Sequence, residues 1–484
     1  MALRTTEQYL AAVKTLRPRV FLRGRPVTDL LANPVTATVV RATARVYELA
    51  QSHEEVMTAT SALNGERVSR NLHVCQSRED LRRRADMALL TSQMTGTCNY
   101  RCVGCDALHA LASVTFEMDR ELRTDYHVRF RAFLARAQRE DLACSGALTD
   151  PKGDRSKRPG QQDDPDLYLR VVERDARGIV VRGAKVHQSG AIAAEETLVL
   201  PGLGLRPGEE QYAVAFAVPN GAKGLTYICQ YTPFSAEREL IRDEYQLGNP
   251  LFGVRETALM VFDDVFIPWE RVFMCGEVAF TRQMVSRFAR MHRMNCGGAC
   301  KVGYGQVMIG AAQVLAEQAG TAKAPHVVEK LGEMARIVAT SHACAIAAAA
   351  EGGEEPAGSG VYLPDSTFGN VAKLNSAEGF FELMKLAGDI GGGLVVTMPS
   401  EAELACEETG DYVRKYLRGT AEAPAAERLR MVKLMQNWAA GLHGVGTWHG
   451  AGSPQAQRMA IYAEADLATW KRLARDLAGL APGR

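Results

Sequence analysis

The spacing of apolar positions changes twice along the chain. Up to about residue 140, apolar residues recur every three or four positions, as in "YHVRFRAFLARAQRE", which predicts amphipathic helices. Between 141 and 275, short β-branched runs alternate with glycine breaks, as in "GIVVRGAKVHQSG", which indicates strands and hairpins. From 276 to 484 the helical period returns. The pattern predicts an α+β protein with an N-terminal α-helical domain (1–140), a middle β domain (141–275) and a C-terminal α-helical domain (276–484).

Composition narrows the class of protein. The 484 residues carry a formal net charge of +1, which gives no electrostatic reason to expect nucleic acid or an anionic membrane as a partner. The first residues lack the apolar core of a secretory signal, and no run of about 18 apolar residues would span a bilayer. Eleven cysteines without such a signal indicate a reducing compartment, so we predict a cytoplasmic protein. A β domain between two helical ones also predicts a cleft suited to a cofactor.

Three cysteines fall close together in "GTCNYRCVGCDALHA", at Cys98, Cys102 and Cys105. If this segment is helical, positions four residues apart share a face, so Cys98 and Cys102 could reach one metal centre. No second Cys-x2-Cys pair completes a four-cysteine zinc site. From this stretch alone, metal ligation and simple burial of the thiols both stay open.

A second candidate is "MHRMNCGGACKVG" (291–303), which carries His292, Cys296, Cys300 and Lys301. The glycine pair in it would weaken an ordinary helix, so it predicts a close approach to a bulky group. A histidine and a thiol from this segment could complete a four-ligand site with the first two cysteines above. Such a donor set suits zinc or an iron–sulfur cluster. A solvated histidine and two buried thiols are the alternative.

Two polar loops lie beside predicted strands, at 148–156 and 183–191. Their backbone N–H groups and polar side chains could hold a flavin edge or a phosphate. Three consecutive glycines in "AGDIGGGLVVTMPSE" allow close approach to a pyrophosphate. They do not form the Gly-x-Gly-x-x-Gly pattern of a Rossmann fold.

Taken together, these segments resemble one family. The strings "RCVGCDALHA", "TDPKGDR", "GIVVRGAKVHQSG", "GGACKVG" and "HGAGSPQAQR" are similar to those of the 4-hydroxybutyryl-CoA dehydratase/vinylacetyl-CoA Δ-isomerase family, within the 4-hydroxyphenylacetate 3-hydroxylase superfamily. The resemblance implies an acyl-CoA dehydrogenase-like fold with a β-barrel or sandwich as middle domain. It implies a homotetramer or homodimer with FAD and a [4Fe-4S] cluster. It also implies dehydration or isomerisation of a hydroxyacyl thioester, linked to CoA or a carrier, by a flavin radical mechanism.

The resemblance also assigns individual residues. The implied metal ligands are Cys98, Cys102, His292 and Cys300. Glycines of the C-terminal domain are implied to reach the flavin of a neighbouring subunit. The implied flavin-binding residues are Thr149, Asp150, Lys152, Gly153, Asp154, Arg155, Ser156, His187, Gln188, Ser189, Gly391, Gly392 and Gly393.

The chain departs from the family pattern at expected acid and base positions. Thr257 stands where a glutamate is expected, and Glu256 precedes it, which on a strand places the acid on the opposite face. Cys296 replaces a tyrosine, and Ala299 is an extra residue before Cys300. A further glutamate expected shortly before "HGAGSPQAQR" has no counterpart in this chain.

We therefore expect His292, Lys301 and Glu256 to carry protons in a related reaction whose acyl substrate is altered. A flavin-dependent oxidoreductase or monooxygenase, of the 4-hydroxyphenylacetate 3-hydroxylase or acyl-CoA dehydrogenase kind, is the alternative. A cofactor-free helical scaffold, in which every cysteine packs in the core, is the third hypothesis. The motifs do not choose among acyl chains, carriers or directions of reaction.

Overall fold

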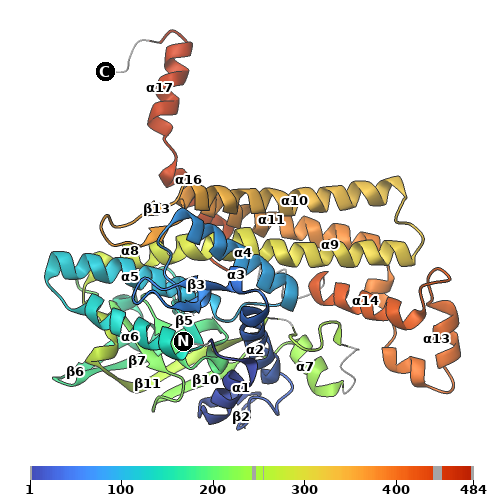
Figure 1. The fold of residues 1–484 in the computed structure, drawn as a ribbon, viewed down its shortest axis with the longest axis horizontal. Helices are drawn as coiled ribbons and strands as arrows, with labels where there is room; N and C mark the ends of the chain where they lie inside the picture. The colour runs from blue at the N-terminus through green and yellow to red at the C-terminus, as the bar shows by residue number, and fades with distance from the viewer. Residues whose placement is uncertain (1–2, 242–246, 254, 440–449, 481–484) are drawn as a thin grey trace.

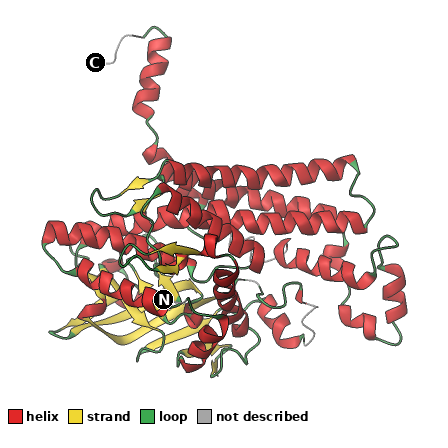
Figure 2. Ribbon diagram, in the orientation of Figure 1, coloured by secondary structure: helices red, strands yellow, loops and turns green. Residues whose placement is uncertain are grey.

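The computed structural model describes residues 3–241, 247–253, 255–439 and 450–480. Helices and strands separate into two layers, with long helices along one side and the sheets along the other (Figures 1 and 2). Helix α17 (Leu467–Leu477) projects away from both layers. Within the described ranges, no helix is both long enough and apolar enough to cross a membrane.

The N-terminal segment is mostly helical but also contributes strands. Helix α1 (Thr6–Thr15) begins at Thr5, whose hydroxyl accepts the Gln8 N–H while the Gln8 side chain accepts the Thr5 N–H. Strand β1 (Arg19–Leu22) pairs with β2 (Arg25–Val27) and runs parallel to β10 (Leu225–Cys229). The larger sheet therefore includes residues of the segment 1–140, which was predicted to be helical. The other elements here are α2 (Thr36–Ser52), α3 (Glu54–Met57), β3 (Thr58–Thr60), β4 (Arg67–Ser69), α4 (Arg78–Thr95), α5 (Cys102–Leu122) and α6 (Tyr126–Glu140).

Two sheets form the β layer. The larger has the strand order β2-β1-β10-β11-β7-β6, and the smaller has the order β12-β9-β8-β5. Strands β7 (Gly178–Ser189) and β11 (Thr257–Pro268) are antiparallel, with Thr257 opposite Ser189. Buried residues of both sheets share one hydrophobic core with α5 and α6. The remaining elements are β5 (Cys144–Ala147), β6 (Arg170–Arg174), β8 (Glu196–Val199), β9 (Val214–Pro219), α7 (Pro233–Leu240) and β12 (Val272–Cys275).

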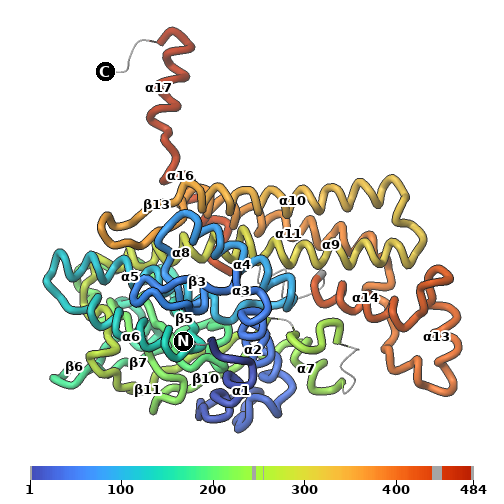
Figure 3. The backbone as a smooth tube through the Cα atoms, viewed as in Figure 1, coloured from blue at the N-terminus to red at the C-terminus, as the bar shows by residue number. Residues whose placement is uncertain are grey.

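Three long helices, α9 (Lys301–Gln318), α10 (Pro325–Ala350) and α11 (Ser366–Gly391), pack side by side above the sheets (Figure 3). Helix α8 (Val278–His292) continues into α9 through η8 (Arg293–Cys300), a π-helical segment. The functional site lies where this continuous helical rod passes α5. The small strands and C-terminal helices are β13 (Gly353–Glu354), β14 (Tyr362–Leu363), α12 (Leu394–Thr397), α13 (Gly410–Tyr416), α14 (Ala425–Ala439) and α16 (Pro454–Glu464).

The glycine pair of η8 lets this segment lie directly against two helices. A Cβ on Gly297 would stand 2.5 Å from the Cα of Lys373 in α11. A Cβ on Gly298 would stand 2.4 Å from the Cβ of Ala345 in α10. Packed atoms do not approach so closely, so both positions require glycine. The bulky group predicted beside the glycines thus includes the neighbouring helices themselves.

Candidate functional site

Five side chains of metal-binding type meet where the start of α5 faces η8. Cys98 and Cys102 come from the N-terminal segment, and His292, Cys296 and Cys300 come from the α8–η8 rod. The Cys102 thiol has the other three thiols as electrostatic neighbours. The His292 imidazole has Cys296 as an electrostatic neighbour. The structure therefore brings the four ligands implied by the sequence together, and adds a fifth donor.

Cys98 does not lie on a helix, so the prediction of an i, i+4 pair on one helical face was wrong. Helix α4 ends at Gly96, which takes the left-handed conformation with φ of 59°, and α5 begins only at Cys102. In the connecting turn, the Asn99 side chain accepts the Arg101 N–H at 3.0 Å. One thiol thus comes from a loop and the other from the first turn of a helix.

Segment η8, which contains Ala299, has π-helical winding. The Lys301 N–H donates to the Cys296 carbonyl, five residues back, where an α-helix would bond four residues back. The wider turn takes in Ala299 without ending the helix. Because steps of four residues return close to the same side of a helix, His292, Cys296 and Cys300 share one face.

Asp106 orients the His292 ring from α5. Its fully buried carboxylate accepts a bond from His292 Nδ1 at 2.7 Å, and others from Asn295 at 3.0 Å and Arg84 at 3.1 Å. Burial would raise the pKa of Asp106, but the Arg84 charge and the bond from His292 keep it below its ordinary value. The carboxylate fixes the orientation of the imidazole through Nδ1.

Positive side chains surround the thiols. Lys301, Lys373 and Arg255 each have Cys296 as an electrostatic neighbour, and both lysines are buried. Burial raises the pKa of Cys296, but the charges of Lys301 and His292 outweigh it and lower that pKa to about 5. The thiolate, which is the metal-binding form of cysteine, is therefore favoured at Cys296, whereas burial raises the pKa of Cys102 and of Cys300.

The donor types at this site are those that an iron–sulfur cluster takes. In the part of the chain that the structure describes, no three His, Cys, Asp or Glu side chains converge as ligands of one metal ion. A cubane cluster does not require such convergence, because each of its irons binds its own protein ligand. Four neighbouring thiols and one imidazole are the donor types that such clusters take.

The two predicted flavin segments lie side by side. The Val186 N–H donates to the Thr149 carbonyl at 2.8 Å. Buried Asp150 forms an ion pair of 2.7 Å with buried Lys185, whose ammonium also donates to two backbone carbonyls. Asp150 therefore anchors the base of its loop. The exposed members of the predicted set are Lys152, Gly153, Asp154, Arg155, Ser156 and His187, and the buried ones are Gln188 and Ser189.

Both loops contain left-handed backbone. Lys152 has φ of 67° and His187 has φ of 62°, values that are uncommon for residues other than glycine. A Cβ on Gly153 would lie 2.5 Å from the Gln162 side-chain oxygen, so no side chain fits there. Non-glycine residues in such conformations concentrate at ligand-binding loops.

Arg255 links the flavin segment to the thiols. Its Nε donates to Ser189 Oγ at 3.3 Å, and its guanidinium has Cys98 as an electrostatic neighbour. Gly190 packs on the loop between the first two cysteines, because a Cβ there would lie 2.4 Å from the Cβ of Tyr100. The end of β7 therefore meets the loop that carries the first donor.

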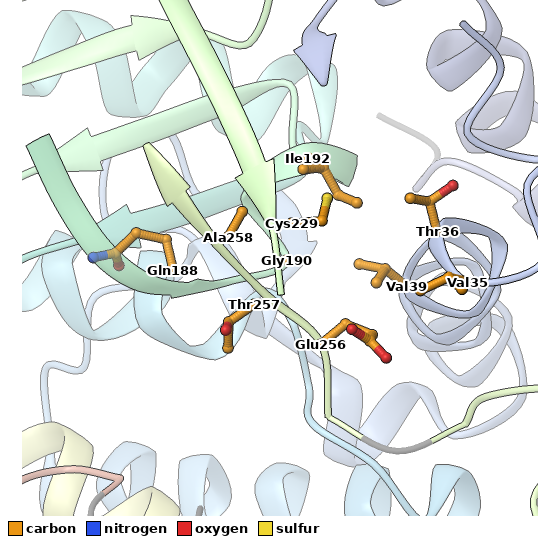
Figure 4. A pocket seen from close by; sticks show the side chains of 10 residues that line it. All are labelled: Val35, Thr36, Val39, Gln188, Gly190, Ile192, Cys229, Glu256, Thr257 and Ala258. Carbon is orange, nitrogen blue, oxygen red and sulfur yellow. The ribbon is translucent and has the colours of Figure 1, made fainter. Parts of the chain in front are cut away.

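Glu256 lines a small pocket beside α2 (Figure 4), and none of Cys98, Cys102, Cys296 and Cys300 lines it. Thr257 points to the opposite side of the strand. Burial raises the pKa of Glu256 to about 8, although the Arg238 charge acts in the other direction. The structure thus brings two of the predicted proton carriers, His292 and Lys301, to the thiols and places the third elsewhere.

The triglycine lies at the other end of the helical layer. A Cβ on Gly391 would meet Leu315, near the C-terminal end of α9, whereas the thiols lie at the N-terminal end of that helix. These ends are roughly 20 Å apart along the helix axis. Within the described chain, Gly391, Gly392 and Gly393 therefore stand away from the flavin segments.

Sequence reasoning does not identify three residues of the site. Asp106 could have been found, because it lies four positions after Cys102 and so shares its helical face. Lys373 is fully buried in α11, but nothing in "NVAKLNS" marks a buried lysine. Arg255 also has no local signal, because its role depends on the pairing of β7 and β11.

Two family models match the chain. The N-terminal part of 4-hydroxyphenylacetate 3-hydroxylase matches residues 5–274, and the C-terminal part matches residues 281–479. The 4-hydroxybutyryl-CoA dehydratase/vinylacetyl-CoA Δ-isomerase of Clostridium aminobutyricum is 41% identical over 494 aligned positions, covering 99% of this chain and 100% of that protein. The 4-hydroxyphenylacetate 3-monooxygenase oxygenase component of Thermus thermophilus is 28% identical over 448 positions, covering 92% and 89%.

Solved structures agree with these matches. The oxygen-tolerant archaeal 4-hydroxybutyryl-CoA dehydratase from N. maritimus has a TM-score of 0.96 at 39% identity, covering 100% of this chain and 96% of that one. The oxygenase component of 4-hydroxyphenylacetate 3-monooxygenase complexed with FAD has a TM-score of 0.85 at 25% identity, covering 98% of each chain. The mixed α/β fold and the family resemblance are confirmed, and the finer acyl-CoA dehydrogenase-like description stays a prediction. The chain is therefore an enzyme that belongs to the 4-hydroxyphenylacetate 3-hydroxylase family and, within it, to the group of 4-hydroxybutyryl-CoA dehydratase/vinylacetyl-CoA isomerase.

Proposed function

We propose that the chain is a FAD- and [4Fe-4S]-dependent dehydratase/isomerase of a hydroxyacyl thioester similar to 4-hydroxybutyryl-CoA. The observation that carries the proposal is the meeting of thiols from two distant segments beside the predicted flavin loops. The names of the Clostridium aminobutyricum and archaeal relatives support the reaction and the CoA thioester. The FAD complex of the related oxygenase supports the flavin.

The cofactor contacts follow from this geometry. FAD would lie against the loop 149–156 and the strand end 186–189, where exposed Lys152 and Arg155 suit its phosphates. Three thiolates for the cluster come from Cys98, Cys102 and Cys300. The fourth donor comes from the turn between His292 and Cys296, and the family pattern gives this place to the histidine.

When bound, the flavin supplies one-electron chemistry that acidifies an otherwise unreactive C–H bond, and the cluster iron supplies a Lewis acid for the departing hydroxyl. The chain's own groups move the protons. His292, held by Asp106 through Nδ1, would present Nε2 as the iron ligand, so proton transfer at the substrate falls to Lys301. Lys301 places a buried positive charge where negative charge develops on the substrate. Glu256 lines a pocket beside α2 that is too small for an acyl substrate, so the proposal assigns it no step of the reaction.

Self-association as a homotetramer or homodimer is part of the proposal. The distance of Gly391, Gly392 and Gly393 from the flavin segments of their own chain supports a role at the flavin of another subunit. Light scattering coupled to size-exclusion chromatography measures this state. A monomer that binds FAD at full stoichiometry would contradict it.

The test of the function is an anaerobic assay of the purified enzyme with 4-hydroxybutyryl-CoA and with vinylacetyl-CoA. We expect both to be converted to the conjugated butenoyl thioester. Conversion of vinylacetyl-CoA alone would restrict the activity to isomerisation. An enzyme that converts neither, but hydroxylates a phenol when given reduced flavin and oxygen, would establish the monooxygenase alternative instead.

A further inference from the structure

A groove of about 410 Å³ opens at the surface between the α8–η8 rod and two loops of the β layer. Three arginines line it. Two of them, Arg282 and Arg293, come from the rod, and Arg158 comes from the loop after β5. The loop after β8 completes the opposite wall with Gly204. A groove with this lining suits an anionic ligand.

The two arginines of the rod lie on one helical face. Arg282, Ser286, Ala289 and Arg293 follow one another in steps of four, three and four residues, which return to the same side of a helix. Ser286 and Ala289 are small, so the floor between the arginines stays open. The two arginines are about 16 Å apart along the helix axis, a separation that suits phosphates at two separate places of one ligand.

The loops opposite the rod are held in place. The Leu205 N–H donates to the Thr281 hydroxyl of α8 at 2.9 Å. Arg158 pairs with Glu209 and also donates to the Gly204 carbonyl at 3.1 Å. Because Arg158 is neutralised by its own acid, it shapes the wall of the groove, and the charge available to a ligand comes from the rod.

Arg293 has no counter-charge among the described residues. Its Nη1 donates to the Asn370 side-chain oxygen at 2.7 Å, while its Nε is buried and has no hydrogen-bond partner in the described chain. Arg282 is exposed and likewise forms no ion pair with a described residue. A half-buried guanidinium without an acid leaves its desolvation uncompensated, and a phosphate supplies the missing charge and acceptors.

The groove lies next to both proposed cofactor sites. Arg293 directly follows His292, which faces the thiols. The loop after β8 touches the base of the flavin loop, because a Cβ on Gly202 would lie 2.4 Å from the carboxylate of Asp150. A ligand with its phosphates in the groove can therefore direct its other end to the flavin and the thiols.

We propose that this groove binds the phosphate groups of the CoA thioester, with Arg282 and Arg293 as the binding residues. Coenzyme A carries a pyrophosphate and a separate 3′-phosphate at one end and the acyl thioester at the other, which matches two arginines set apart along one helical face. FAD has its phosphates at one place, and exposed Lys152 and Arg155 are available for them. The inference rests on the proposed function and adds the place where the carrier end of the substrate binds.

The test is calorimetric titration of the anaerobically purified holoenzyme with adenosine 3′,5′-bisphosphate, which carries the phosphates of CoA at two places. We expect the wild type to bind it, and Arg282→Gln and Arg293→Gln each to weaken binding about tenfold, because each removes a charge-assisted contact. Ala289→Leu keeps both charges but fills the floor of the groove, so it should weaken binding to a similar degree. Arg336→Gln, at an exposed arginine of α10, is the control and should match the wild type.

FAD binding distinguishes the two ligands that carry phosphate. Fluorescence titration should give the same FAD affinity for Arg282→Gln, Arg293→Gln and the wild type. A loss of FAD affinity without a loss of bisphosphate affinity would assign the groove to the flavin and overturn the inference. A wild type that does not bind the bisphosphate would also overturn it. Thermal midpoints show whether a loss reflects unfolding, and exposed Arg282 provides a variant whose fold should not change.

Turnover separates the inference from the proposed function. With 4-hydroxybutyryl-CoA, both arginine variants should raise KM about tenfold, whereas 4-hydroxybutyryl-N-acetylcysteamine, a thioester without phosphates, should show no such increase. An active enzyme whose KM for the CoA thioester is unchanged in both variants overturns the inference and leaves the function standing. An enzyme that binds the bisphosphate through these arginines but converts neither CoA thioester refutes the proposed function and leaves the phosphate site standing.

Discussion

Asp106 and His292 lie 186 positions apart in the sequence and meet at 2.7 Å between the carboxylate Oδ2 and the imidazole Nδ1. The contact joins α5 to the end of α8, so it fixes the two segments that supply the thiols relative to one another. Asp106 also pairs with Arg84 of α4, and both side chains have no exposed surface. One carboxylate thus stabilises the helix packing and sets the direction of the histidine.

Replacing the Asp106 carboxylate should lower the stability of the fold. In Asp106→Asn, the Arg84 charge stays buried without its counter-charge, so we expect the free energy of unfolding to fall by about 3–5 kcal/mol. Urea unfolding of the apoprotein measures this loss. Asp86→Asn is the control, because Asp86 pairs with Arg82 at the surface of α4 and should cost less than about 1 kcal/mol. Equal losses in the two variants would contradict the role of Asp106.

The helix packing at η8 should fail with one added methyl group. Gly297→Ala would push a Cβ to 2.5 Å from the Lys373 backbone, and we expect a loss of about 1–3 kcal/mol in unfolding free energy. Gly310→Ala in α9 is the matched control, because a Cβ there meets nothing within 4 Å. That change should be neutral or stabilising by up to about 1 kcal/mol. A stable Gly297→Ala protein would show that η8 does not pack against α11 as described.

Glu256 should make stability depend on pH. Its pKa is about 8 in the folded protein against an ordinary value of 4.5, so the folded state binds the proton more tightly than the unfolded state. The wild type therefore loses stability as pH rises from 4.5 through 8. Glu256→Gln removes this titration, so the free energy of unfolding of the variant should rise relative to the wild type across that window, by up to about 5 kcal/mol above pH 8.

Urea unfolding of Glu256→Gln and the wild type at pH 5 and pH 8.5 measures the difference. Other titrating groups are common to both proteins and cancel in the comparison. Glu79→Gln, at an exposed position of α4, should show no such pH-dependent gain. If the difference in unfolding free energy between Glu256→Gln and the wild type is the same at both pH values, the pKa of Glu256 is not raised.

Substitutions of exposed residues in the flavin loop should weaken FAD binding without changing the stability of the fold. Lys152→Ala and Arg155→Ala change exposed side chains, so each should weaken FAD binding about tenfold while the unfolding free energy changes by less than about 0.5 kcal/mol. Lys185→Met should behave differently, because it leaves Asp150 buried without its ion-pair partner and destabilises the apoprotein. FAD fluorescence titration and urea unfolding provide the two readouts. Unchanged FAD affinity in both alanine variants would place the flavin elsewhere.

The sequence predicts those parts of the fold that depend on local pattern. Helix α6 spans Tyr126–Glu140, the same residues whose apolar spacing predicts it. The alanine-rich end of α10 buries one face, with Ala345, Ala348 and Ala349 enclosed. Periodicity identifies these elements because each buries one face of a single helix against a core.

Features that depend on distant packing escape sequence reasoning. The parallel pairing of β1 with β10 joins segments about 200 residues apart, and no local signal marks it. The π-helical winding of η8, in which the Lys301 N–H donates to the Cys296 carbonyl, has no local signal in the sequence. The thiols could be located by their spacing and resemblance. The buried cations near these thiols, Lys373 above all, can be identified only from the packing of α11 against η8.

The central claim is that these thiols hold an iron–sulfur cluster beside a flavin. Iron, acid-labile sulfide and FAD should be measured per chain in anaerobically purified protein, for the wild type and for Cys102→Ser. The account predicts a brown wild type with about four irons, about four sulfides and one FAD, and a Cys102→Ser variant that keeps the flavin but loses the iron. A wild type with FAD and no iron, or a Cys102→Ser variant with the full iron content, would contradict it.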